Sequence, residues 1–165
     1  SLGATDHILS HRIEKATGVE FNIVSFKQGT EANMALLGGH VDFGLGNPSE
    51  MAGQMQAGKL RALATATEKR LPYLPNVPTL KEEGVDVSIA QIRGIWGTKN
   101  MPREVVQYLE TAFSKLTKTE AWKKYLADEM VLDSFMGSAE YTKWLDRELK
   151  RYTQELTELG LIKKK

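Results

Sequence analysis

The first part of the chain alternates between helical and strand-like spacing of apolar positions. Ile8, Leu9 and Ile13 fall near helical spacing, a Thr-Asp pair can cap the first turn, and a glycine follows the last one. This pattern predicts a helix over 5–17. Short β-rich runs and short helical runs then follow one another. The predicted strands are 21–26, 41–45 and 60–66, and the predicted helices between them are 31–37 and 50–57.

Three strands separated by two helices form the order βαβαβ, which is typical of a parallel sheet with right-handed crossovers. The sequence therefore predicts an α/β lobe. A charged, proline-containing connection over 68–76 follows the third strand. A helical turn is expected at 79–83, and the chain is then expected to run extended through 85–98.

The rest of the chain is dominated by amphipathic helical patterns. Helices are predicted from Pro102 to Leu116, from Thr119, and from Ser138 to about Gly160, with a short strand over 130–135. The last helix carries an apolar stripe at three- and four-residue spacing, which must cover another surface. The stripe consists of Tyr141, Leu145, Leu149, Tyr152, Leu156 and Leu159.

Composition narrows the possible partners. The 165 residues are 41% hydrophobic and carry a net charge of +1, with charged residues interrupting every apolar stretch. A membrane-spanning segment is therefore excluded, and nucleic acid is an unexpected partner because no basic field is present. Cysteine is absent, which leaves both cytoplasm and periplasm open. The chain starts at Ser1 without a Met or a signal region, so we expect the natural protein to begin upstream.

Charge changes along the chain. Residues 1–90 hold 8 Lys and Arg against 10 Asp and Glu, whereas residues 91–165 hold 14 against 11. Because the change coincides with the shift from mixed to helical patterning, it suggests a boundary near Gln91.

Two groupings near the start resemble catalytic or metal sites only loosely. His7 and His11 stand four residues apart, which is half of a metal site on one helix face, but no glutamate base accompanies them. Capping and packing explain the pair more simply. Asp6, His7 and Ser10 could imitate a hydrolase triad, although residues so close in sequence rarely reach that geometry. A small α/β enzyme using Asp6 and His7 as an acid/base pair stays the alternative function.

Three glycine-bearing loops are more informative. Residues 3–6 and 28–31 both precede predicted helices, and residues 46–49 follow the second predicted strand. Helix starts offer unpaired amides and the positive end of the dipole, so converging starts can hold a carboxylate or phosphate. Open α/β sheets bind ligands at this edge. The alternative is that the glycines serve turn geometry alone.

Several motifs, in unbroken order, resemble the Bug family, the extracytoplasmic receptors of tripartite tricarboxylate transporters. They are the helix ending in Ala-Thr-Gly-Val, and the stretches ALLGGHVD at 35–42, QAGKLRALA at 56–64, LPNVPTLKEEG at 74–84 and RGIWG at 93–97. The resemblance implies the fold of type II periplasmic binding proteins, in which two α/β lobes are joined by crossing strands. Family members are about twice as long as this chain.

On this resemblance, residues 1–92 are the second ligand-binding lobe, incomplete at its N-terminus. Residues 93–165 would supply the hinge strand and the C-terminal helical segment that packs on the first lobe. The family's ligand-contacting segments fall on Gly3, Ala4, Thr5 and Asp6; on Lys27, Gly29 and Thr30; on Gly46 and Asn47; and on Arg93.

This sequence departs from many relatives at two of these segments. A hydroxyl residue is common where Ala4 stands, and a tyrosine is common where Phe26 stands. Their loss removes possible hydrogen-bond donors. Arg93 is a cation whose planar guanidinium could hold a second carboxylate, unless it is simply a surface arginine beside the hinge strand.

The resemblance implies a non-catalytic receptor that binds a small carboxylate or amino-acid-like solute between two lobes. It implies the membrane subunits of the transporter as partners, a periplasmic location after removal of an upstream signal peptide, and no cofactor, metal or catalytic residue. A third reading is an oligomerising interaction domain, because the stripe from Tyr141 to Leu159 would be exposed without the other lobe.

Overall fold

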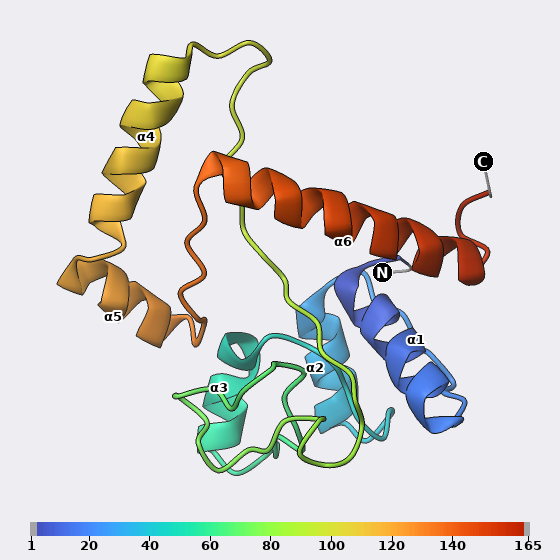
Figure 1. The fold of residues 1–165 in the computed structure, drawn as a ribbon. Helices are drawn as coiled ribbons and strands as arrows, with labels where there is room; N and C mark the ends of the chain where they lie inside the picture. The colour runs from blue at the N-terminus through green and yellow to red at the C-terminus, as the bar shows by residue number, and fades with distance from the viewer. Residues whose placement is uncertain (1–2, 164–165) are drawn as a thin grey trace. The chain divides into compact units, whose positions relative to one another are not determined.

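The computed structural model describes residues 3–163 and contains six helices in that range (Figure 1). They are α1 (Thr5–Thr17), α2 (Gly29–Leu37), α3 (Pro48–Gln56), α4 (Arg103–Leu116), α5 (Glu120–Asp128) and α6 (Ser138–Glu158). All six helices predicted from the apolar spacing are confirmed, with α2 and α3 each starting two residues earlier than predicted. The chain forms two compact units, residues 1–91 and residues 92–165.

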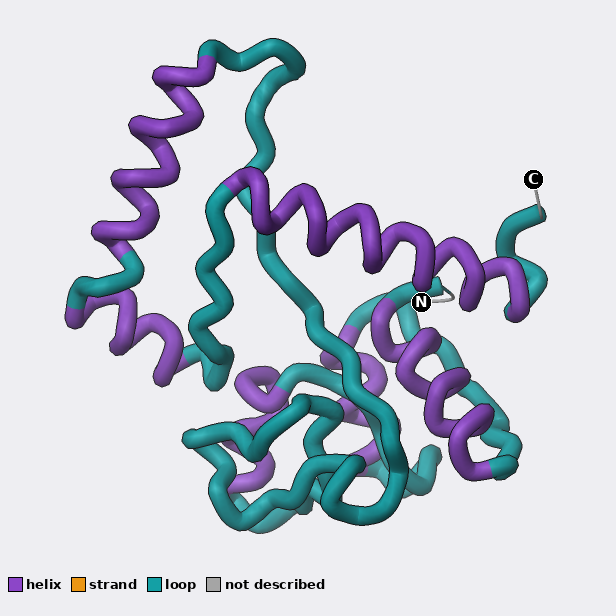
Figure 2. The backbone as a smooth tube through the Cα atoms, viewed as in Figure 1, coloured by secondary structure: helices purple, strands orange, loops and turns teal. Residues whose placement is uncertain are grey.

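The predicted strands are not formed. Residues 21–26, 41–45, 60–66 and 130–135 are irregular, as the loop colouring in Figure 2 shows, and residues 3–163 contain no strand ladder. A single parallel bridge joins Thr65 to Thr79. The amide of Thr65 donates to the Pro78 carbonyl at 2.8 Å, and the amide of Leu80 donates to the Thr65 carbonyl at 2.9 Å.

The physical reason is that β-propensity reports a half-buried apolar surface, whereas a strand also needs a neighbouring backbone about 4.8 Å away. Residues 21–26 and 41–45 line a common cavity. They meet through side chains, with the rings of Phe21 and Phe43 packed edge to face at 5.2 Å. Ring contacts of this kind bury apolar surface without closing backbone hydrogen bonds between the segments.

Helix α1 is fixed to the first unit by its buried face. Ile8 is 0% exposed, and Leu9 and Ser10 are also buried. The guanidinium of Arg12 donates to the Ser88 carbonyl at 2.8 Å, which ties the helix to a segment far along the chain. Gly18 ends the helix with φ 72, and its amide donates to the Glu14 carbonyl at 2.8 Å. Only glycine adopts this left-handed backbone without strain.

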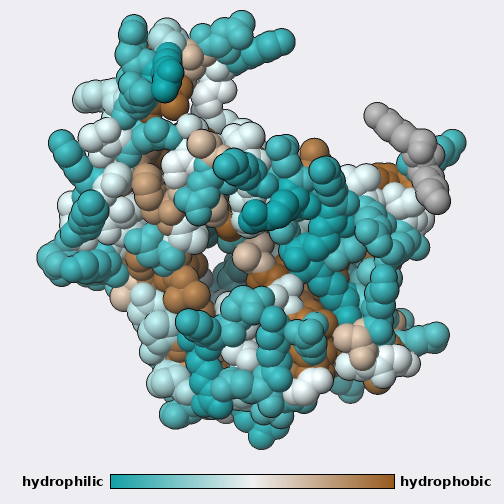
Figure 3. Space-filling view, viewed as in Figure 1, coloured by the Kyte–Doolittle hydropathy of each residue, from teal (hydrophilic) through white to brown (hydrophobic). Residues whose placement is uncertain are grey.

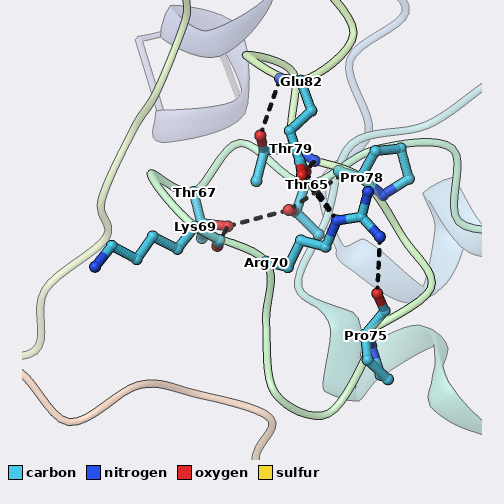
Figure 4. Close-up of polar contacts among 8 residues, drawn as sticks. All are labelled: Thr65, Thr67, Lys69, Arg70, Pro75, Pro78, Thr79 and Glu82. Carbon is cyan, nitrogen blue, oxygen red and sulfur yellow. Dashed lines mark hydrogen bonds and ion pairs between the residues drawn. The ribbon is translucent and has the colours of Figure 1, made fainter.

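The loop from Thr65 to Glu82 is held by the polar network drawn in Figure 4. Thr79 and Glu82 form a reciprocal capping box: the Glu82 amide donates to the Thr79 hydroxyl at 3.2 Å, and the Thr79 amide donates to the Glu82 carboxylate at 2.8 Å. The hydrogen bond from Arg70, reinforced by that from the Thr79 amide, lowers the pKa of the Glu82 carboxyl. Leu71 in this loop and Val87 just after it are buried. A loop without ladders is therefore still well fixed.

A second ion cluster lies on this loop and just after it. Lys81 Nζ is 2.7 Å from a Glu68 oxygen and 3.5 Å from an Asp86 oxygen. Hydrogen bonds from Lys81 and Ser88 lower the pKa of Glu68, and the bond to Glu68 raises the pKa of Lys81. Both side chains are exposed, so solvent screens these pairs and they add little stability individually.

The second unit is helical and has little enclosed core. Leu126, which is 9% exposed, is its one buried apolar residue among those described, and neither α4 nor α6 has a buried residue. Thr119 caps α5 by accepting from the Trp122 amide. Apolar side chains stand among polar ones on the visible surface in Figure 3, and Leu149 of the predicted stripe is 69% exposed. No helix in residues 3–163 is both long and apolar enough to cross a bilayer.

Aromatic side chains organise one end of α6. The rings of Tyr141 and Trp144 stack with 10° between their planes, and Trp96 packs on Tyr141 at 5.8 Å. A Cβ atom added to Gly94 would lie 2.1 Å from the Tyr141 hydroxyl oxygen. The segment around Gly94 therefore approaches Tyr141 more closely than any larger residue allows.

Candidate functional site

A cavity of about 630 Å³ lies within the first unit. Its wall includes the first turn of α1, the loops leading into α2 and α3, three residues of α2 (Gly29, Ala32 and Asn33), and Glu50 of α3. Its volume falls in the range of small-molecule binding sites. Three helix N-termini thus contribute to one cavity, although the strands predicted to carry them are absent.

Most of the predicted site residues of this unit are brought together here. The cavity is lined by Ala4, Thr5, Asp6, Lys27, Gly29, Gly46 and Asn47. Gly3 and Thr30 flank the lining but do not form part of it. Gly3 instead donates its amide to Nδ1 of His7 at 2.9 Å. Asn47 contributes an amide side chain that is already bonded to Glu50.

Arg93 belongs to the second unit. Its guanidinium Nη1 donates to the Tyr125 hydroxyl at 2.7 Å, and it is not among the residues that line the cavity. Its predicted role as a second cation for the solute stays a prediction.

The start of α1 opens onto this cavity. Ala4 is the N-cap residue with an extended backbone, and it provides no side-chain cap. The first amide that bonds back along the helix is that of Ile8, which donates to the Ala4 carbonyl at 3.0 Å. The amides of the first turn therefore have no partner in the helix itself. Together with the Thr5 hydroxyl, they offer donors at the positive end of a 13-residue helix.

Each of the three helices carries an acid in its first turn: Asp6 in α1, Glu31 in α2 and Glu50 in α3. Glu50, in the first turn of α3, accepts through Oε1 from the side-chain amide of Asn47 at 2.8 Å. Its Oε2 lies 2.9 Å from the position that a Cβ on Gly29, the first residue of α2, would occupy. The Lys27 amide just before α2 donates to the Glu31 carboxylate at 3.2 Å. Two carboxylates thus lie near the start of α2, and one of them, that of Glu31, accepts from the Lys27 amide.

The charged side chains around the cavity are mostly acidic. The lining includes four carboxylates, one lysine and two histidines. The acids are Asp6, Glu20, Asp42 and Glu50, and the bases are Lys27, His7 and His40. With neutral histidines the described wall is therefore negative, which disfavours a solute whose charges are all negative.

The acid/base grouping at the start of α1 is not assembled as a triad. Nδ1 of His7 accepts the Gly3 amide, and the Ser10 hydroxyl donates to the backbone carbonyl of Asp6 at 3.0 Å. Each of these hydrogen bonds has a backbone partner, so neither connects the side chains of a nucleophile, a base and an orienting acid. Within residues 3–163 no group of three or more His, Cys, Asp or Glu side chains is placed to hold a metal ion.

Sequence reasoning missed several wall residues. Glu50 is the most informative of them. The segment Asn47-Pro48-Ser49-Glu50 has the pattern of a helix start, in which a capping residue is followed three positions later by Glu. The sequence pattern predicts strands for Phe21 and Phe43, whereas both residues line the cavity wall.

The chain is similar to known proteins in sequence and in structure. The family model for receptors of the tripartite tricarboxylate transporter family, TctC, matches residues 1–161. A UPF0065 protein in the gbd 5' region of Cupriavidus necator is 31% identical over 159 residues, which cover 96% of this chain and 48% of that protein. BugT of Bordetella pertussis is 32% identical over 90 residues, or 54% of this chain and 28% of BugT.

Solved structures show the same fold. A TctC solute-binding protein from Polaromonas, determined without ligand, matches with a TM-score of 0.79 and 29% identity, covering 96% of this chain and 55% of that one. The periplasmic binding protein BugD matches with a TM-score of 0.77 and 23% identity, covering 97% and 55% of the two chains. MatC from Rhodopseudomonas palustris, solved with bound malate, matches with a TM-score of 0.75 and 21% identity, covering 94% and 54%.

These matches confirm the predicted fold class at the level of architecture, even though the strands of the predicted sheet are not formed as ladders here. The chain spans about half the length of the relatives and solved chains it matches.

Proposed function

This chain belongs to the tripartite tricarboxylate transporter receptor family, and on that premise we propose that it captures a small carboxylated solute without changing it chemically. The observation that carries the proposal is the uncapped start of α1, which opens onto a cavity of about 630 Å³. Backbone amides and the Thr5 hydroxyl there would replace the water around a carboxylate.

Two further findings support a carboxylate solute. The polar residues of the α1 loop line the cavity as the family resemblance implies. MatC, which shares the fold, was solved with malate bound. The unassembled grouping of Asp6, His7 and Ser10 gives no support to an acid/base enzyme.

We also propose the division of labour that the resemblance implies. Residues 1–92 act as the second ligand-binding lobe. Residues 93–165 act as the hinge strand and the C-terminal helical segment that packs on the first lobe, and Arg93 is a ligand-binding residue. The parent receptor would work in the periplasm, as the name of BugD states for that protein, and deliver solute to the membrane subunits of its transporter. Oligomerisation through α6 stays an untested prediction.

Isothermal titration calorimetry of the full-chain receptor tests the proposal. The titrants are a set of small carboxylates, amino acids and their uncharged amides. We expect saturable binding of at least one carboxylate, no binding of its amide counterpart, and recovery of the solute unchanged when the mixture is analysed by NMR. Consumption of the solute, or equal binding of carboxylate and amide, would overturn it.

A further inference from the structure

The imidazole of His7 forms one hydrogen bond within residues 3–163, and that bond fixes where the ring carries its proton. Nδ1 accepts the Gly3 amide at 2.9 Å. A ring nitrogen that accepts an N–H group has no proton of its own, and both nitrogens of an imidazolium are donors. The contact with Gly3 therefore assigns His7 as a neutral ring with its proton on Nε2.

The protonated nitrogen of this ring has no partner among the described residues. The hydrogen bond of the ring is made at Nδ1, which leaves Nε2 without one. Trp122 Nε1 is the one buried side-chain nitrogen or oxygen without a partner among described residues that are at least partly buried. Because His7 is half-buried and its Nε2 is not in that group, Nε2 is accessible. His7 also lines the cavity of about 630 Å³, so the wall includes an imidazole with an N–H group to offer.

His7 belongs to the same helix start as the proposed carboxylate position. It is the third residue of α1, whose first amides have no partner within the helix. Ala4 and Thr5, which precede it, line the same cavity. An imidazole N–H at this place adds a neutral donor to the backbone amides and the Thr5 hydroxyl. The simpler alternative is that His7 only holds the loop before α1 through its contact with Gly3.

The Gly3 contact also decides which groups His7 can bind. A neutral imidazole with both nitrogens free could exchange tautomers and offer either a donor or an acceptor. With Nδ1 occupied by the Gly3 amide, only donation from Nε2 remains. A carboxylate oxygen accepts such a donor, whereas an ammonium group has no lone pair with which to accept it. The arrangement therefore favours an oxygen of the solute at this nitrogen.

Resting on the function proposed above, we infer that His7 is a solute-binding residue that donates from Nε2–H to an oxygen of the solute carboxylate. The Gly3 amide sets this role, because it holds Nδ1 as the acceptor and so keeps the proton on Nε2. His7 acts as a hydrogen-bond donor here and takes no proton from the solute.

The first measurement needs no solute. The ring nitrogens of His7 are observed by ¹⁵N NMR in the ¹⁵N-labelled full-chain receptor at about pH 8. We expect an unprotonated Nδ1, a protonated Nε2, and a coupling across the hydrogen bond from the Gly3 amide to Nδ1. A proton on Nδ1, or an even mixture of the two tautomers, would overturn the inference.

The second measurement adds acetate, lactate and succinate in turn to the same sample. We expect the Nε2–H signal of His7 to shift and saturate with each probe that calorimetry shows to bind. The ring signals of His11, which lies one turn further along α1 and does not line the cavity, serve as the reference and are expected to stay in place. Saturable binding that leaves the Nε2–H signal of His7 unmoved would overturn the inference.

Two variants separate the donor at Nε2 from the contact with Gly3. An asparagine side chain reaches about as far as Nδ1, so His7→Asn keeps an acceptor for Gly3 and loses the donor. A glutamine side chain reaches about as far as Nε2, so His7→Gln keeps an N–H donor there. We expect the affinity for the bound probe to fall about tenfold in His7→Asn and to stay within about threefold of the wild type in His7→Gln.

The reverse order of the two variants would show that His7 acts only through Gly3, and equal affinities would show that the donor has no role; either result would overturn the inference. His11→Asn is the matched control, because it makes the same change on the same helix outside the cavity lining, and its affinity is expected to be unchanged. Circular dichroism melts check that all variants are folded. If no carboxylate of the calorimetric set binds the wild type, the proposed function fails, while the first measurement still decides the tautomer of His7.

Discussion

Arg70 donates from one nitrogen, Nε, to both carboxylate oxygens of Glu82, at 3.0 and 2.9 Å. The same guanidinium donates through Nη1 to the Pro75 carbonyl at 3.0 Å. One exposed ion pair of this kind contributes little by itself. Here it is joined to the capping box of Thr79, so it fixes a loop that no strand ladder holds.

Protonation of Glu82 at acid pH is expected to lower the stability of the first unit. Its pKa in the folded chain lies below its ordinary value of 4.5, chiefly because Arg70 donates to it. A carboxyl with a lowered folded pKa stabilises the fold above its unfolded pKa, and that contribution is lost as pH falls through the folded pKa. Urea midpoints measured from pH 7 to pH 3 should therefore fall less steeply below about pH 4.5 in Glu82→Gln than in the wild type. Parallel curves would contradict this role.

Thr79 should matter through its hydroxyl. It is 2% exposed, and its Oγ1 accepts the Glu82 amide. We expect Thr79→Ala to lower the free energy of unfolding by about 1–2 kcal/mol, the usual cost of losing such a cap. Thr79→Ser keeps the hydroxyl and is expected to lose about half as much or less. Denaturant titration of both variants makes the comparison, and equal losses would show that methyl packing, rather than capping, is what Thr79 contributes.

Thr5 is expected to contribute to solute binding. It lines the cavity at the uncapped start of α1. Thr5→Val should weaken carboxylate binding about tenfold, which corresponds to the loss of one hydrogen bond to a charged group. Thr17→Val is the matched control at the other end of α1, where the hydroxyl donates to the Ile13 carbonyl at 2.7 Å and accepts from the Val19 amide at 3.3 Å. Calorimetry should find no change in affinity for this control; equal weakening in both variants would point to a general effect on the helix.

Substitution by alanine should stabilise the fold at Gly53 and disturb side-chain packing at Gly94. A Cβ at Gly53, within α3, would meet nothing within 4 Å, whereas one at Gly94 would lie 2.1 Å from the Tyr141 oxygen. Gly53→Ala should stabilise the first unit by about 0.5–1 kcal/mol. Gly94→Ala should disturb the packing of Trp96 on Tyr141 and change the near-ultraviolet circular dichroism of the second unit. An unchanged aromatic signal would contradict the close approach of Gly94.

The helices could be predicted because their signals are local. α1 ends at Gly18 as its spacing indicates, and Thr119 caps α5 as expected. The absence of strands could not be predicted, because the apolar pattern that includes Phe21 and Phe43 fits a cavity wall as well as it fits paired strands. Apolar alternation describes a surface, and pairing of backbones is a separate, non-local event.

The glycine-bearing loops before helices predict site residues around Ala4, Gly29 and Asn47, and these residues line one cavity. That a solute binds there stays a prediction. What the sequence pattern could not show is that the chain places its own carboxylate, Glu50, beside Gly29. The contact joins residues 21 positions apart in the sequence, so only the folded arrangement reveals it.

The central claim is that a solute carboxylate binds at the start of α1. It is tested most directly by following the amide signals of Thr5, Asp6 and His7 by ¹H–¹⁵N NMR while the best-binding carboxylate is added to the full-chain receptor. We predict that these amides shift together and saturate at the concentration at which calorimetry shows binding, with the solute intact afterwards. Saturable binding that leaves the α1 amides unmoved would contradict the claim.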